Sequence, residues 1–171
     1  HEFDLVGHSP SFSSWRFENA VSISDDLMVV GEHNSHEWFT NADAAYVYAR
    51  TGMTWIESAS LSWSTASFSD SFGFSVAVDG TRVFVGAPYD DVGGERSGSV
   101  FVYQRMGGVW TEVARLAPDS SPEQLGWSLS ADGDRVAIGA DRADDDPAPF
   151  SEGGGAVYVF ERTSGTTWTR A

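Results

Sequence analysis

Clustered carboxylates are the side chains of this chain that could most directly do chemistry. Two acidic groups lie about fifty residues apart along the sequence. Their members are Asp90, Asp91, Asp141, Asp144, Asp145 and Asp146. Neighbouring carboxylates repel one another unless a hard cation is present, and calcium takes roughly six to eight such oxygens. We therefore favour a solvated, negatively charged loop, and a site for calcium or another hard cation is the alternative.

Other catalytic patterns are missing from the sequence. The histidine-rich stretch 32–37 does not follow the His-Glu-x-x-His pattern of zinc proteases, so a polar loop is favoured over a metal site. No Gly-x-Ser-x-Gly elbow is present, and the glycine pairs at 93–94 and 153–155 lack the lysine of a phosphate-binding loop. We expect no catalytic residues, no certain cofactor and no enzymatic activity.

Tryptophan rings are the remaining candidates for ligand contact, because flat rings can stack on sugars. Three of the seven recur at intervals of 55 and 58 residues, namely Trp55, Trp110 and Trp168, which indicates a structural role. Trp38 and Phe39 fall outside this spacing, in a long loop. They are the best candidates for an exposed ligand contact.

The elements that position these residues belong to a pattern that occurs three times. In each copy an apolar run ends near a glycine, a polar loop follows, and a second apolar run leads to a tryptophan. The glycines are Gly31, Gly86 and Gly139, at intervals of 55 and 53 residues. Repeated spacing of this kind indicates a fold assembled from repeated structural units.

Each copy predicts four short β-strands. The runs are rich in Val, Phe, Tyr and Trp, and Gly/Asp pairs such as Asp79-Gly80 suit tight hairpins between them. No sustained helical periodicity is present. Four-stranded repeats of about 40–50 residues are typical of propeller blades. We predict an all-β fold of three four-stranded antiparallel blades, at 14–68, 69–121 and 122–171, with residues 1–13 supplying an N-terminal strand.

The second copy carries Phe72-Gly73 followed by Gly86-Ala87-Pro88. It resembles the FG-GAP repeat of integrin α-chain propellers and of many bacterial exported proteins, and its sequence is most similar to the bacterial branch. The third copy has Leu125-Gly126, and the first has Phe17-Glu18. The resemblance implies an extracellular or cell-surface protein. Calcium-binding repeats of this family hold the ion between the first two strands, where the connections here are too short to wrap one.

The composition of the chain limits the classes of partner that it is expected to bind. The formal net charge is −15, from 25 acidic and 10 basic residues. Such a surface repels phosphate backbones, so neither nucleic acid nor an anionic membrane is an expected partner. No apolar run approaches the roughly 20 residues that cross a bilayer, so no membrane insertion is expected. The chain has no cysteine, which removes disulfides and thiolate chemistry.

The chain ends suggest assembly. Three blades cannot close a ring, and open blades expose strand edges. The last strand breaks off at Trp168, Thr169, Arg170 and Ala171, and the first residues read as its missing continuation: His1, Glu2, Phe3, Asp4 and Leu5. We expect head-to-tail pairing of these ends between copies, giving a structural oligomer or filament. The alternative is an adhesion or ligand-binding propeller module for protein or carbohydrate, including one cut from a longer propeller.

Overall fold

The computed structural model describes residues 16–33, 43–62, 70–118, 124–142 and 154–171. These segments form three four-stranded antiparallel sheets, which we call blades 1, 2 and 3. Blade 1 contains β1 (Arg16–Ser24), β2 (Leu27–His33), β3 (Ala44–Thr51) and β4 (Thr54–Leu61). Blade 2 contains β5 (Ser75–Asp79), β6 (Arg82–Ala87), β7 (Ser99–Met106) and β8 (Val109–Leu116). Blade 3 contains β9 (Leu125–Asp132), β10 (Arg135–Ala140), β11 (Ala156–Ser164) and β12 (Thr167–Arg170).

Strands are neighbours in the order in which they follow one another along the chain, so each blade is an up-and-down meander. In each blade, a two-residue turn joins the first strand to the second. The first turn residue has a positive φ in all three blades, 53° at Asp25, 55° at Gly80 and 57° at Gly133. Glycine and aspartate tolerate this backbone region better than most residues, as the sequence predicted for the Asp-Gly pairs.

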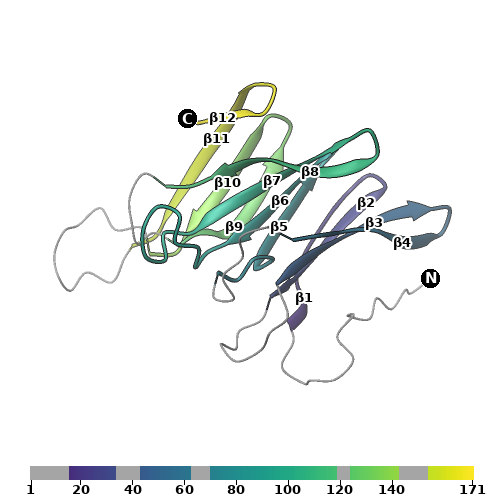
Figure 1. Ribbon diagram of the computed structural model, residues 1–171, viewed down its shortest axis with the longest axis horizontal. Helices are drawn as coiled ribbons and strands as arrows, with labels where there is room; N and C mark the ends of the chain where they lie inside the picture. The colour runs from purple at the N-terminus through teal and green to yellow at the C-terminus, as the bar shows by residue number, and fades with distance from the viewer. Residues whose placement is uncertain (1–15, 34–42, 63–69, 119–123, 143–153) are drawn as a thin grey trace.

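The three blades stack face to face in chain order (Figure 1). The face of blade 2 that carries Val83 and Val85 packs on blade 1, and the opposite face with Phe84 packs on blade 3. These three consecutive residues of β6 are fully buried. Their continuous apolar pattern therefore reflects burial on both sides of the sheet.

A close backbone contact sits at each junction between blades. Gly73, in the turn before β5 of blade 2, lies against Gly31 of blade 1, and Gly126, the second residue of β9 in blade 3, lies against Gly86 of blade 2. A Cβ on Gly73 would come within 2.6 Å of the Ala44 carbonyl oxygen. Only glycine fits such a contact without moving the backbone. The glycines of the repeat therefore set the distance between blades.

The opposite end of the second junction carries an ion pair between blades. Asp134, in the turn between β9 and β10, accepts hydrogen bonds from Arg162 of its own blade at 2.6 Å and from Arg82 of blade 2 at 3.0 Å. The Arg82 guanidinium also lies 5.9 Å from the centre of the Trp168 ring. These contacts tie blade 3 to blade 2 at the turn end.

The repeated tryptophans occupy equivalent places in the outer strands. Trp55, Trp110 and Trp168 are the second residues of β4, β8 and β12, and all three are half-buried. Trp110 packs on the core between blades 1 and 2, and Trp168 on the core between blades 2 and 3. The rings are therefore structural, although more exposed than a fully covered core residue.

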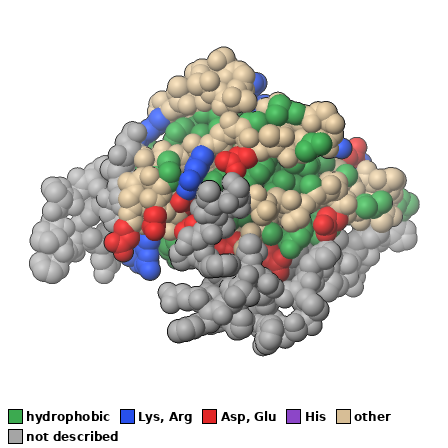
Figure 2. Space-filling model, in the orientation of Figure 1, with side chains coloured by type: hydrophobic (Ala, Val, Ile, Leu, Met, Phe, Trp, Pro, Cys, Tyr) green, Lys and Arg blue, Asp and Glu red, His purple; other side chains and the backbone are tan. Residues whose placement is uncertain are grey.

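The stack is open at both ends, because within the described residues blade 1 and blade 3 each pack on blade 2 alone. The sequence predicted such an open arrangement of four-stranded blades. Figure 2 shows hydrophobic side chains across the middle of one view of the molecule, with charged side chains beside and around them. The described part of the chain contains no helix long and apolar enough to cross a membrane.

Candidate functional site

Asp90 is the centre of a hydrogen-bond network in the loop that follows β6. Its side chain is 5 % exposed. One carboxylate oxygen accepts hydrogen bonds from the Arg115 guanidinium and the Ser99 hydroxyl, and the other accepts one from the Val92 N–H at 3.2 Å. Burial lowers the pKa of Arg115, with the charge of Asp70 acting in the opposite direction. The carboxylate of Asp90 is therefore committed to a buried ion pair.

The rest of this loop is held by hydrogen bonds within the loop and by backbone contacts with blade 3. Asp91 accepts a hydrogen bond from the Arg96 N–H at 2.8 Å through its carboxylate. The backbone N–H of Leu125 donates to the Ser97 carbonyl at 3.0 Å, and Gly98 forms a parallel bridge with Leu125. The loop of blade 2 thus helps to hold the first strand of blade 3.

The predicted calcium site draws on residues from two blades. Asp90 and Asp91 lie in the blade 2 loop, whereas Asp141 follows β10 in blade 3. The other three aspartates, Asp144, Asp145 and Asp146, lie outside the described residues. Within the described ranges, no three His, Asp or Glu side chains are grouped so that they could hold a metal ion. A cation at Asp90 would have to displace Arg115, and calcium binding by these loops stays a prediction.

A row of aromatic side chains crosses the junction between blades 2 and 3 at the same end of the strands. Phe74 and Trp127 lie with their ring centres 4.7 Å apart, and Tyr89 meets Trp127 edge-on at 6.4 Å. The Arg96 guanidinium lies 5.7 Å from the centre of the Tyr89 ring. Phe74, Trp127 and Tyr89 are half-buried, so each ring keeps part of its surface open to solvent. We call Phe74, Tyr89, Trp127 and Arg96 the aromatic row.

Blade 1 extends the row with polar groups. The His33 ring lies 5.0 Å from that of Phe74. Glu32, which precedes His33 in the chain, is 5 % exposed. Within the part of the chain described, the Oε1 atom of Glu32 accepts no hydrogen bond. Burial, followed by the hydrogen bond to Glu32, raises the pKa of Tyr46. The phenol is thus held neutral at physiological pH.

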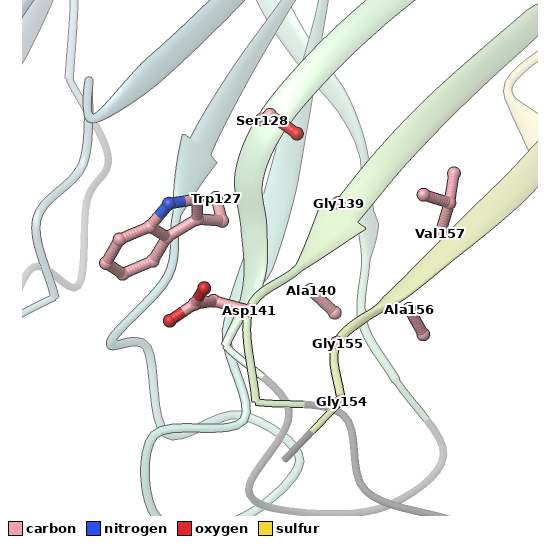
Figure 3. Close-up of a pocket in the computed structure, with 9 residues that line it drawn as sticks. All are labelled: Trp127, Ser128, Gly139, Ala140, Asp141, Gly154, Gly155, Ala156 and Val157. Carbon is pink, nitrogen blue, oxygen red and sulfur yellow. The ribbon is translucent and has the colours of Figure 1, made fainter. Parts of the chain in front are cut away.

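A hollow of about 590 Å³ lies beside the row on blade 3. Figure 3 shows the Trp127 ring and the Asp141 carboxylate on one side of β9, with Gly139, Ala140 and Ala156 on the other. The hollow therefore offers an aromatic face, a carboxylate and exposed backbone.

Sequence reasoning had not singled out the aromatic row. A sequence pattern that could have identified it is the aromatic residue directly after Gly73 in the second copy, Phe74, and directly after Gly126 in the third, Trp127. The residues that were singled out, Trp38 and Phe39, lie outside the described residues, as do His1, Glu2, Phe3, Asp4 and Leu5. Trp168, Thr169 and Arg170 form β12, which pairs with β11 alone and is half as long as β8.

Comparison with known proteins agrees with this architecture. The model of the FG-GAP repeat matches residues 55–103 and 110–160. Integrin alpha-7 of Rattus norvegicus and of Mus musculus are each 34 % identical to this chain over 108 residues, which cover 54 % of the chain. The alignments cover 9 % and 8 % of the two integrins, so the chain spans less than a tenth of their length. Each match begins in the outer strand of one blade and ends in the third strand of the next blade. Because the matched repeats make up more than half of the chain, the chain belongs to the FG-GAP repeat family.

Proposed function

We propose that this chain is a non-catalytic binding module, located outside the cell or on its surface, that holds a protein ligand on the aromatic row. The row carries this proposal, because it places three partly exposed rings and a guanidinium on one continuous surface. Tryptophan, tyrosine and arginine are the residues that contribute most to binding energy in protein interfaces. The similarity to integrin alpha-7 repeats supports the assignment to adhesion.

Charge and shape favour a particular class of ligand. The chain carries a net charge of −15, so a basic segment of the partner would be attracted to it. Asp141 lies at the edge of the hollow and could pair with such a basic side chain. An apolar or aromatic residue of the same segment would fit over Trp127. The expected ligand is therefore an extended peptide that combines basic and aromatic residues.

A peptide library displayed on phage and selected on the full chain tests this proposal. Enriched peptides should contain basic and aromatic residues, and their affinity should fall at least about ten-fold for Trp127→Ala and for Tyr89→Ala, as for interface hot spots. Val109→Ala is the control, because Val109 is an exposed hydrophobic residue in the hairpin at the far end of blade 2.

The proposal is wrong if the selected peptides bind both aromatic-row variants as well as they bind the original chain. A glycan array tests the competing hypothesis that the aromatic row binds carbohydrate. Carbohydrate binding that disappears with Trp127→Ala would assign the row to sugars instead, because stacking on an aromatic ring does not require a peptide.

Self-assembly is a second candidate function, and the open ends of the blade stack favour it. Strand β12 has a free edge beyond its pairing with β11, and an unpaired edge can accept a strand from another chain. The first five residues are the expected donor. Sedimentation of the full chain and of a chain without His1–Leu5 tests this idea: larger species should be lost on truncation. A full chain that sediments as a monomer at every concentration would contradict it.

A further inference from the structure

Two Asp-Gly pairs lie at equivalent turns of blades 2 and 3. In Asp79-Gly80 and Asp132-Gly133 the aspartate ends the first strand of the blade and the glycine begins the two-residue turn. No other Asp-Gly pair and no Asn-Gly pair occurs in the 171 residues. Glycine has no side chain, so its backbone nitrogen can approach the preceding carboxyl group without hindrance. These pairs are therefore the places where a backbone nitrogen is best able to attack an aspartate side chain.

The reaction at such a pair needs neither an enzyme nor a cofactor. The glycine nitrogen forms a bond to the aspartate Cγ, and one carboxyl oxygen leaves as water with the amide proton. The product is a five-membered succinimide ring. Water then opens the ring at either carbonyl: attack at Cγ restores aspartate, and attack at the main-chain carbonyl gives isoaspartate. One water is lost and one is gained, so the mass is unchanged while the backbone gains one atom.

The two pairs differ in how the glycine nitrogen is held. The Gly80 N–H donates a hydrogen bond of 3.5 Å to the Ser24 hydroxyl of blade 1. Within the part of the chain that the structure describes, the Gly133 N–H has no such acceptor. The strand pairing that closes the hairpin is the same around both pairs. The contact with blade 1 therefore protects the pair of blade 2 and leaves that of blade 3 reactive.

The surroundings of Asp132 also leave room for the reaction. Asp132 is exposed, whereas Asp79 is half-buried. Asp132 lines a hollow of about 220 Å³ together with Arg135 and Glu161. Its side chain can therefore turn toward the Gly133 nitrogen, and water can reach the ring to open it.

We propose that Asp132 is a site of spontaneous isomerisation, and that its conversion to isoaspartate loosens the contact between blades 2 and 3. Asp134 lies two residues further along and binds both Arg162 and Arg82. The two-residue turn, with a φ of 57° at Gly133, holds the Asp134 carboxylate where both guanidinium groups reach it. An additional backbone atom in this turn moves the carboxylate away from Arg82, so the ion pair between the blades is lost.

Incubation of the full chain in water enriched in heavy oxygen tests the proposal, because opening of the ring places one solvent oxygen on the residue. After several weeks at physiological temperature, the chain is digested in ordinary water, and fragment mass spectra locate the label and distinguish isoaspartate from aspartate. The label should enter residue 132 at least about two-fold faster than residue 79, the factor expected for one weak hydrogen bond.

Two variants test the structural reasons. Ser24→Ala removes the acceptor of the Gly80 N–H and should raise the labelling rate of residue 79 toward that of residue 132. Asp132→Ser gives blade 3 the residue that blade 1 has at the same place, Ser24, and cannot form the ring. Its melting temperature should stay constant during incubation. The isomerised original chain, separated by chromatography, should melt about 2–4 °C lower than before.

Equal labelling of residues 132 and 79 in the original chain, or no label at residue 132, would overturn the assignment of the site. Isomerised protein that melts at the original temperature would overturn the effect on the contact between blades. A melting temperature that falls equally in the Asp132→Ser variant would place the damage elsewhere in the chain and would also count against the proposal.

Discussion

Asp90 illustrates how a residue type can suggest one chemistry and the fold can assign another. A pair of neighbouring aspartates in a loop suggested a solvated loop or a cation site, yet Asp90 is buried and paired with Arg115. The guanidinium also lies 4.9 Å from the centre of the Phe101 ring, against the core. Removing one partner of a buried pair leaves the other charge without compensation.

Asp90→Asn should therefore lower the free energy of unfolding by about 2–3 kcal/mol, less than for a fully buried pair because Arg115 is partly exposed. Asp91→Asn is the matched control and should change it by less than about 0.5 kcal/mol, because Asp91 is exposed. Urea unfolding in calcium and in a chelator measures both. If the Asp90→Asn loss occurs only in calcium, the carboxylate is a cation ligand and the structural role is wrong.

At the scale of the elements, the contact between blades depends on groups from different strands. Asp134 in a turn of blade 3 binds Arg162 of its own blade and Arg82 at the start of β6. The hydrogen bond from Arg162, followed by that from Arg82, lowers the pKa of Asp134. A carboxyl group with a lowered pKa in the folded state stabilises the fold at pH values above its unfolded pKa of about 3.9.

The stability difference between the original chain and Asp134→Asn should consequently be constant above about pH 5 and should shrink as the pH falls through the lowered folded pKa. Thermal unfolding at a series of pH values measures it. Asp132→Asn is a suitable control in the same hairpin, because no ion pair of Asp132 occurs within the described residues. An Asp134→Asn difference that grows on acidification would have the wrong sign for this mechanism.

At the scale of the elements, the strands and hairpins could be predicted from the sequence, whereas the contacts between blades could not. Strand number, blade type and the hairpins followed from apolar runs and Asp-Gly pairs, because these depend on residues close together in the chain. The aromatic row joins Phe74, Tyr89 and Trp127 across a junction between blades. Its geometry depends on how one sheet sits on the next, which local patterns do not specify. Arg115 was missed for the same reason, since 25 residues separate it from Asp90.

For the whole molecule, the net charge of −15 should matter more than any single ion pair. Repulsion between like charges destabilises the compact state, and salt screens it over distances of about 10 Å at 0.1 M. Raising sodium chloride from about 0.01 to 0.2 M should therefore raise the melting temperature. Differential scanning fluorimetry measures this directly. A melting temperature that falls with salt would mean that attractive pairs such as Arg82–Asp134 outweigh the repulsion.

The glycine contacts between blades also bear on how such chains change in evolution. Both junctions combine an apolar core with a contact between backbone glycines, and this glycine contact uses groups that every hydrophobic-glycine repeat possesses. An in-frame duplication of one repeat would then create a new junction without needing compensating substitutions elsewhere. The number of repeats could thus vary between descendants, whereas loss of the glycine, as at Glu18, would mark a blade that no longer accepts such an upstream neighbour.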